Sequence, residues 1–73
     1  MSEDVACLDR GDVRAVLMLR SRRAYLLYGR GAEPRARALG EWYAGKGYAV
    51  ELSEAGGGEA ERLWEELCRW HYT

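Results

Sequence analysis

Arginines in the first half of the chain are the residues best suited to chemistry. Eight of them fall between positions 10 and 37 against two acidic residues, whereas six glutamates fall between positions 51 and 66 against one arginine. The formal net charge is only −1, so charges of opposite sign are separated along the chain. Arginine binds phosphates and carboxylates in a planar, bidentate geometry. The candidates for nucleic-acid or anion binding are Arg14, Arg20, Arg22, Arg23, Arg30, Arg35 and Arg37.

A glycine turn, Gly29-Arg30-Gly31, precedes Pro34, which suits the first position of a helix. Free N–H groups at such a helix start, with arginines nearby, can hold a phosphate or a carboxylate. However, Pro34 occupies the third glycine position of the dinucleotide-binding fingerprint, and no Walker lysine–serine pair is present. A turn with solvated arginines is the simpler interpretation, and we predict no cofactor.

Residues for nucleophilic or metal chemistry are few. Cys7 and Cys68 lie at opposite ends of the chain without a C-x-x-C partner, and His71 is the single histidine. Three such residues do not complete a metal site, and a Cys68–His71 pair lacks an orienting third group. We therefore predict no metal and no enzyme activity. Two reduced thiols are expected in a cytoplasmic protein, with a Cys7–Cys68 bond as the alternative if the chain ends meet.

The central stretch, residues 24–52, predicts a β-α-β unit that must position these groups. Residues 24–28 are aromatic and aliphatic, as in a strand, and they end at the glycine turn. A helix with one apolar face then runs from Pro34 to a stop at Gly45 and Gly47. Residues 48–52 alternate apolar and polar positions, which predicts a half-buried strand.

Two further elements flank this unit. Residues 13–19 are the most continuously apolar run, so we expect a strand at the centre of the sheet, joined to the next strand by a tight turn at Ser21 and Arg22. A second helix begins near Gly58 or Glu59, after a polar, glycine-rich link. Residues 1–11 are expected to be a flexible N-terminal arm, and residues 12–73 a single domain.

The predicted fold is a two-layer α+β domain, β-β-α-β-α, with a three-stranded sheet in the order 2-1-3. The alternative order, 1-2-3, pairs the second and third strands directly and would put the most apolar strand on an edge. We expect both helices on one face, following the short-connection rules of such folds. The opposite face would be uncovered, apolar at its centre and rimmed by arginines, which is typical of an interface. The protein-interface candidates on this face are Val16, Met18, Tyr25 and Leu27.

These features predict a small, non-catalytic binding module. The leading hypothesis is a protein-interaction or regulatory protein, forming a homodimer or binding another protein through the uncovered face. The alternative is nucleic-acid binding through the hairpin arginines with Tyr25 as a stacking platform. An enzyme or anion binder at residues 29–31 ranks third. No apolar run has the ~20 residues of a membrane helix, and the acidic N-terminus does not resemble a signal peptide.

Overall fold

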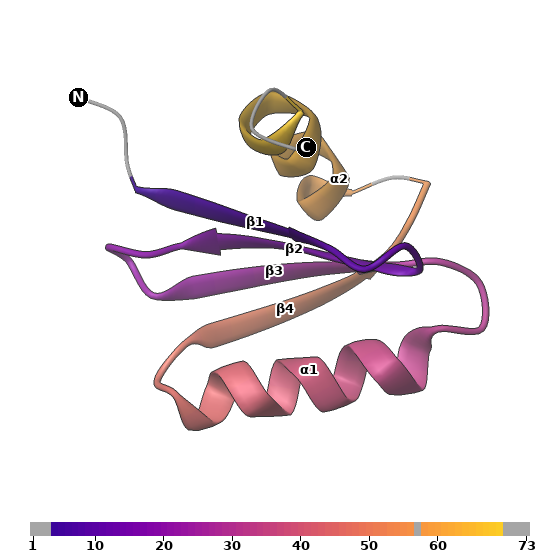
Figure 1. Cartoon of the computed structure of the whole chain (residues 1–73), viewed down its shortest axis with the longest axis horizontal. Helices are drawn as coiled ribbons and strands as arrows, with labels where there is room; N and C mark the ends of the chain where they lie inside the picture. Colours follow the sequence, from indigo (N-terminus) through magenta and orange to yellow (C-terminus); the bar gives the residue numbers. More distant parts are fainter. Residues whose placement is uncertain (1–3, 57, 70–73) are drawn as a thin grey trace.

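The computed structural model describes residues 4–56 and 58–69 and shows a mixed α+β fold with a sheet and two helical segments (Figure 1). The second helical segment, α2 (Glu59–Leu63), continues directly into a π-helical turn, η1 (Trp64–Cys68), in which the Arg69 N–H donates to the Trp64 carbonyl over 3.1 Å. The elements are β1 (Val5–Asp9), β2 (Val13–Met18), β3 (Arg23–Tyr28), α1 (Glu33–Gly45), β4 (Ala49–Glu54), α2 (Glu59–Leu63) and η1 (Trp64–Cys68).

The sheet has four strands in the order β1-β2-β3-β4, so the predicted three-stranded 2-1-3 arrangement is wrong. Strands β1, β2 and β3 are antiparallel neighbours, and β3 pairs directly with β4 in parallel. The prediction placed β2 between β3 and β4 in order to bury its apolar run. In the structure β1 covers that edge of β2 instead, and α1 returns the chain to the strand next to β3.

The extra strand comes from the segment that was expected to be a flexible arm. Residues 5–9 alternate between the two faces of the sheet: Val5 and Cys7 pack on the side of α2, and Ala6 and Leu8 on the side of α1. Each of the five residues is half-buried. The N-terminal segment is therefore part of the domain from Val5 onwards.

The β2–β3 connection differs from the predicted two-residue turn. Residues 19–22 form the connection, and Arg22 adopts a positive φ of 58°. A two-residue turn at Ser21 and Arg22 would pair Leu17 with Leu26. In the structure Leu17 faces Ala24, so the register is shifted by two residues. Because side chains alternate with period two, this shift keeps every residue on its predicted face.

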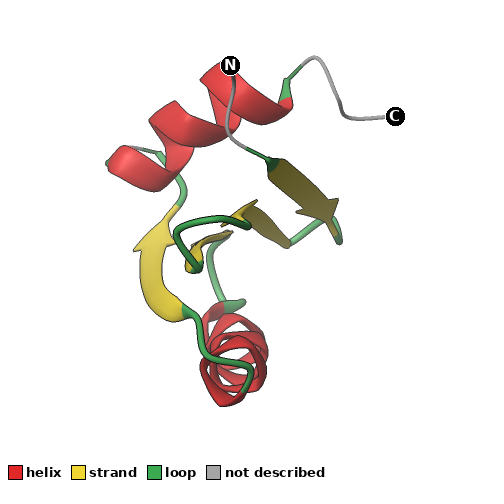
Figure 2. Cartoon of the chain, turned by 90° about the vertical axis from the view of Figure 1, so that its left-hand side faces the viewer, coloured by secondary structure: helices red, strands yellow, loops and turns green. Residues whose placement is uncertain are grey.

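The helices lie on opposite faces of the sheet, which corrects the prediction that both share one face (Figure 2). The helix α1 packs with Tyr43 on a core of Ala15, Leu17, Ala24 and Leu26. On the other face, the α2–η1 segment packs Ala60, Trp64 and Cys68 on Val16 and Leu27. The sheet is thus the middle layer of three.

Candidate binding site

The predicted protein interface lies beneath the α2–η1 segment. Val16 is 2 % exposed and Leu27 is 4 % exposed, and Met18 and Tyr25 are half-buried in the same cluster. The expectation of an uncovered face was therefore wrong. It rested on placing both helices on one face of the sheet, whereas the chain crosses to the other face after β4. In the folded protein this face is a core and not an open surface.

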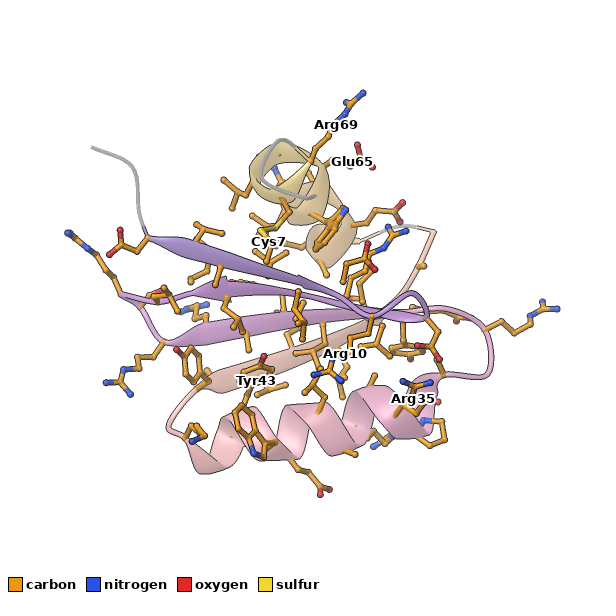
Figure 3. All side chains as sticks on the ribbon, viewed as in Figure 1. Cys7, Arg10, Arg35, Tyr43, Glu65 and Arg69 are labelled. Atoms are coloured by element: carbon orange, nitrogen blue, oxygen red, sulfur yellow. A yellow bond between two sulfur atoms is a disulfide. The ribbon has the colours of Figure 1, made fainter. Side chains whose placement is uncertain are left out.

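Both cysteines are joined in a disulfide, against the expectation of two reduced thiols. Cys7 in β1 and Cys68 in η1 have Cα atoms 5.8 Å apart and are 61 positions apart in the sequence. The bond ties the α2–η1 segment to the edge strand (Figure 3). It weighs against the predicted cytoplasmic location, because disulfides are rare in that reducing compartment. His71, the other half of the Cys68–His71 pair, lies outside the described residues.

The seven candidate arginines do not gather on one surface. Arg20, Arg22 and Arg23 lie at the β2–β3 turn, and the positions from Arg30 onwards lie at the opposite end of the sheet, where α1 begins (Figure 1). Most of them have partners within the protein. Arg14 approaches Asp9 and the Trp64 ring, Arg20 approaches Asp4, Arg22 donates to the Lys46 carbonyl, Arg35 pairs with Asp12, and Arg37 pairs with Glu33. Interaction with the Tyr25 hydroxyl raises the pKa of Arg23.

The glycine turn at residues 29–31 leads into α1 as predicted. Gly31 has a φ of +83°, Pro34 stands in the first turn, and the Ala32 N–H donates to the Gly29 carbonyl. In the described part of the chain, the Arg30 guanidinium has no ion pair or hydrogen bond, whereas the two arginines on the helix are each held by a carboxylate. These contacts support a β-α turn with solvated arginines more than an anion site.

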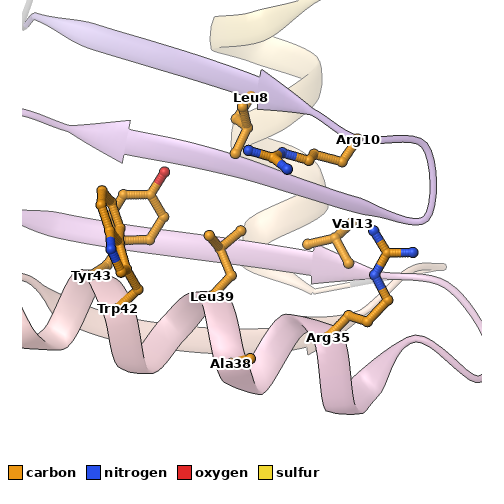
Figure 4. A pocket seen from close by; sticks show the side chains of 8 residues that line it. All are labelled: Leu8, Arg10, Val13, Arg35, Ala38, Leu39, Trp42 and Tyr43. Carbon is orange, nitrogen blue, oxygen red and sulfur yellow. The ribbon is translucent and has the colours of Figure 1, made fainter.

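A cleft lies on the face of the sheet that carries α1, between this helix and the two strands β1 and β2. It arises because α1 packs on β3 and β4 and leaves the α1-facing side of β1 and β2 partly open. Its volume is about 550 Å³ (Figure 4). The lining residues are Leu8, Arg10, Val13, Arg35, Ala38, Leu39, Trp42 and Tyr43.

One wall of this cleft, which we call the Trp42 cleft, is aromatic. Trp42 is 57 % exposed, an unusual state for a tryptophan, and meets Tyr43 edge-on with ring centroids 5.1 Å apart. The Lys46 ammonium lies 4.6 Å from the centroid of the Trp42 ring, within cation–π distance. Burial raises the pKa of the Tyr43 hydroxyl above its ordinary value, and the charge of Arg10 partly opposes this rise.

The charge inside the Trp42 cleft is positive. Arg35 is largely neutralised, because its Nη1 lies 2.9 Å from Asp12 Oδ2. Arg10 is exposed and, among the described residues, has neither an ion pair nor a side-chain hydrogen bond; its guanidinium extends over Leu8 into the cleft (Figure 4). The cleft therefore offers one uncompensated guanidinium beside an apolar floor.

The free edge of β1 adjoins this cleft. The Arg10 N–H donates to the Val13 carbonyl and the Asp4 carbonyl accepts from Leu19, so even-numbered residues of this segment bond to β2. In an antiparallel ladder the backbone groups of alternate residues point in opposite directions. Those of Val5, Cys7 and Asp9 therefore point away from the sheet, where β1 has no second neighbouring strand among the described residues.

The sequence predictions did not single out this region. Arg10 was one of the eight clustered arginines, Trp42 lay in the predicted helix without a role, and the strand at residues 5–9 was assigned to an arm. The short apolar run of residues 5–8 and the presence of a tryptophan in the predicted helix were the available signals. Neither signal shows that α1 leaves half of the sheet open.

No protein-family model, curated protein or solved structure matches the chain. In the described residues, no helix combines the length and apolar character needed to cross a membrane. The same residues contain no cluster of three or more histidine, cysteine, aspartate or glutamate side chains that could hold a metal ion.

Proposed function

We propose that the protein is a small non-catalytic binding module that docks an extended segment of a protein along β1, with side chains of that segment entering the Trp42 cleft. The observation that carries this proposal is the position of the cleft: an exposed tryptophan and an arginine adjoin a sheet edge, and within residues 4–56 and 58–69 neither the arginine side chain nor the edge has a partner.

The cleft chemistry favours a partner with apolar and acidic side chains. Leu8, Val13 and Leu39 offer an apolar floor, and tryptophan and arginine are the residue types that most often dominate binding energy at protein interfaces. A carboxylate can bond to the Arg10 guanidinium in bidentate geometry, which is stronger than a neutral hydrogen bond.

The edge of β1 supplies the backbone part of this recognition. An added strand can bond to the outward N–H and C=O groups of Val5, Cys7 and Asp9, while its alternate side chains face α1. Only side chains on that face reach the cleft. The expected partner sequence therefore alternates, with an acidic and an apolar residue two positions apart on the same face.

Selection from a random peptide library displayed on phage, with the protein as bait, tests the proposal. We expect enrichment of peptides with this alternation, and at least tenfold weaker binding of the enriched peptides to Arg10→Glu and to Trp42→Ala. Arg30→Glu is the matched control, because Arg30 is an exposed arginine outside the cleft. Peptides in which lysine replaces the acidic residue should regain binding to Arg10→Glu. Failure to enrich any such peptide, or equal binding to all variants, would contradict the proposal.

Nucleic-acid binding through Arg14, Arg20, Arg22, Arg23 and Tyr25 has weaker support. Tyr25 is half-buried beneath the α2–η1 segment, where its ring faces protein side chains, and base stacking needs an accessible ring. The arginines are also engaged with acidic, carbonyl or aromatic groups of the protein itself.

A further inference from the structure

We infer that the segment that pairs with β1 is β1 of a second copy of this chain, antiparallel to the first about a two-fold axis at Cys7. The inference rests on the proposed function, because it names the partner of the same surface. The resulting dimer has one continuous eight-stranded sheet, formed from the four strands of each copy.

The direction of the backbone groups restricts the register of this pairing. An added antiparallel strand must present its own outward-facing residues to Val5, Cys7 and Asp9. When both strands are β1, each opposed pair consists of two odd-numbered residues. Because the strands are antiparallel, the two residue numbers of every pair add up to the same even number, and this sum defines the register. A sum of 14 opposes Val5 to Asp9, and Cys7 to itself, and so uses every outward-facing residue of the strand. Sums of 12 and 16 leave one of them unpaired.

The charges select the same register. A sum of 14 places Arg10 opposite Asp4 of the partner subunit, on the face of the sheet that carries α1. Asp4 is available for this contact, because its side chain is 68 % exposed and its ion pair with Arg20 is long, at 4.0 Å. A sum of 16 would instead place Arg10 opposite an alanine, and a sum of 12 would oppose Asp4 to Leu8. The partner copy thus supplies the carboxylate that the Trp42 cleft lacks.

The apolar side chains of the edge are also complementary. At this register Leu8 lies opposite Ala6 of the partner subunit, so a large side chain meets a small one on the α1 side. Dimer formation would also cover the exposed β1 edge of each copy, and an exposed edge in a monomer can pair with strands of other chains. A domain of this size has a small core, and association adds buried surface.

Hydrogen exchange followed by NMR tests this pairing without any substitution. In a dimer of this register, the amide protons of Val5, Cys7 and Asp9 become protected from exchange as protein concentration rises. The amides of Ala6 and Leu8 bond to β2 and stay protected at every concentration. Fast exchange at the three odd positions up to about 1 mM protein, in a particle of monomer mass by light scattering, would overturn the inference.

Substitutions that reverse the charges of Asp4 and Arg10 test the register itself. We expect Asp4→Arg and Arg10→Asp each to raise the dimer dissociation constant at least tenfold in sedimentation equilibrium, and the double variant to restore it to within about threefold. Arg30→Asp serves as the control and should leave association unchanged. A dimer indifferent to the single substitutions would overturn this register. If the chain is monomeric while enriched peptides still bind at Arg10 and Trp42, the second copy is excluded and the proposed function stands.

Discussion

Gly47 shows how one residue ends α1 and starts β4. It has a φ of +95°, its N–H donates to the Ala44 carbonyl, and the Tyr48 N–H donates to the Tyr43 carbonyl. This pair of bonds is the Schellman motif, in which the position after the helix cap takes a left-handed conformation that glycine adopts without steric cost. Gly45, two residues earlier, is still helical and has open space around the position of a Cβ.

Alanine at these two positions should therefore change stability in opposite directions. We expect Gly47→Ala to lower the free energy of unfolding by about 1–2 kcal/mol, because an L side chain is strained at positive φ. Gly45→Ala should raise it by up to about 1 kcal/mol, since alanine is the better helix former. Urea denaturation of both variants beside the wild type measures the difference. Changes of the same sign would contradict this account of the helix end.

The α2–η1 segment depends on the Cys7–Cys68 disulfide to stay packed on the sheet. Its helical residues span only ten positions, and a glycine-containing link connects it to β4. Helices this short are marginal in water by themselves, so packing and the Cys7–Cys68 bond must hold the segment on the sheet. The sheet face with Val16 and Leu27 stays covered only while the segment is docked.

Loss of the disulfide should destabilise the whole domain. The cysteines are 61 positions apart, and the chain-entropy model assigns about 4 kcal/mol to a loop of that length. We expect the Cys7→Ala/Cys68→Ala variant to unfold at lower urea concentration by an amount that corresponds to about 2–4 kcal/mol. Dithiothreitol should shift the wild type in the same direction and leave the double variant unchanged. A wild type with two titratable thiols and unaltered stability would disprove this role.

At the scale of the whole molecule, folding distributes the charges that the sequence separates. Basic and acidic groups from different elements meet, as in the Arg35–Asp12 pair that joins α1 to the β1–β2 connection. Exposed pairs of this kind contribute about 0–1 kcal/mol each to stability. Their main effect here is to break up the positive field that eight clustered arginines would otherwise create.

We accordingly expect little affinity for nucleic acid. Fluorescence anisotropy of labelled single- and double-stranded oligonucleotides should show no binding tighter than about 100 μM at about 50 mM salt, the weak end of non-specific association. Micromolar binding that weakens at about 200 mM salt, and that Arg20→Glu/Arg23→Glu abolishes, would show a phosphate-binding surface and return this function to first place.

The sequence by itself determined the β-α-β unit, the glycine stop at Gly47 and the face on which each residue of β2, β3 and β4 lies. These features follow from local preferences and from the periods of helix and strand, which neighbouring residues encode. The two-residue error in the β2–β3 register did not change the faces, because their period is two.

Only the tertiary structure decided which elements are neighbours. The Cys7–Cys68 disulfide and the covering of Val16 by the α2–η1 segment both join residues that are far apart in the chain, whereas β1 pairs with the strand that follows it. Local patterns show which side of an element is apolar, but they do not specify what covers it. The Trp42 cleft depends on which strands α1 covers. Because α1 packs on β3 and β4, Trp42 and Arg10 border the half of the sheet that α1 leaves open.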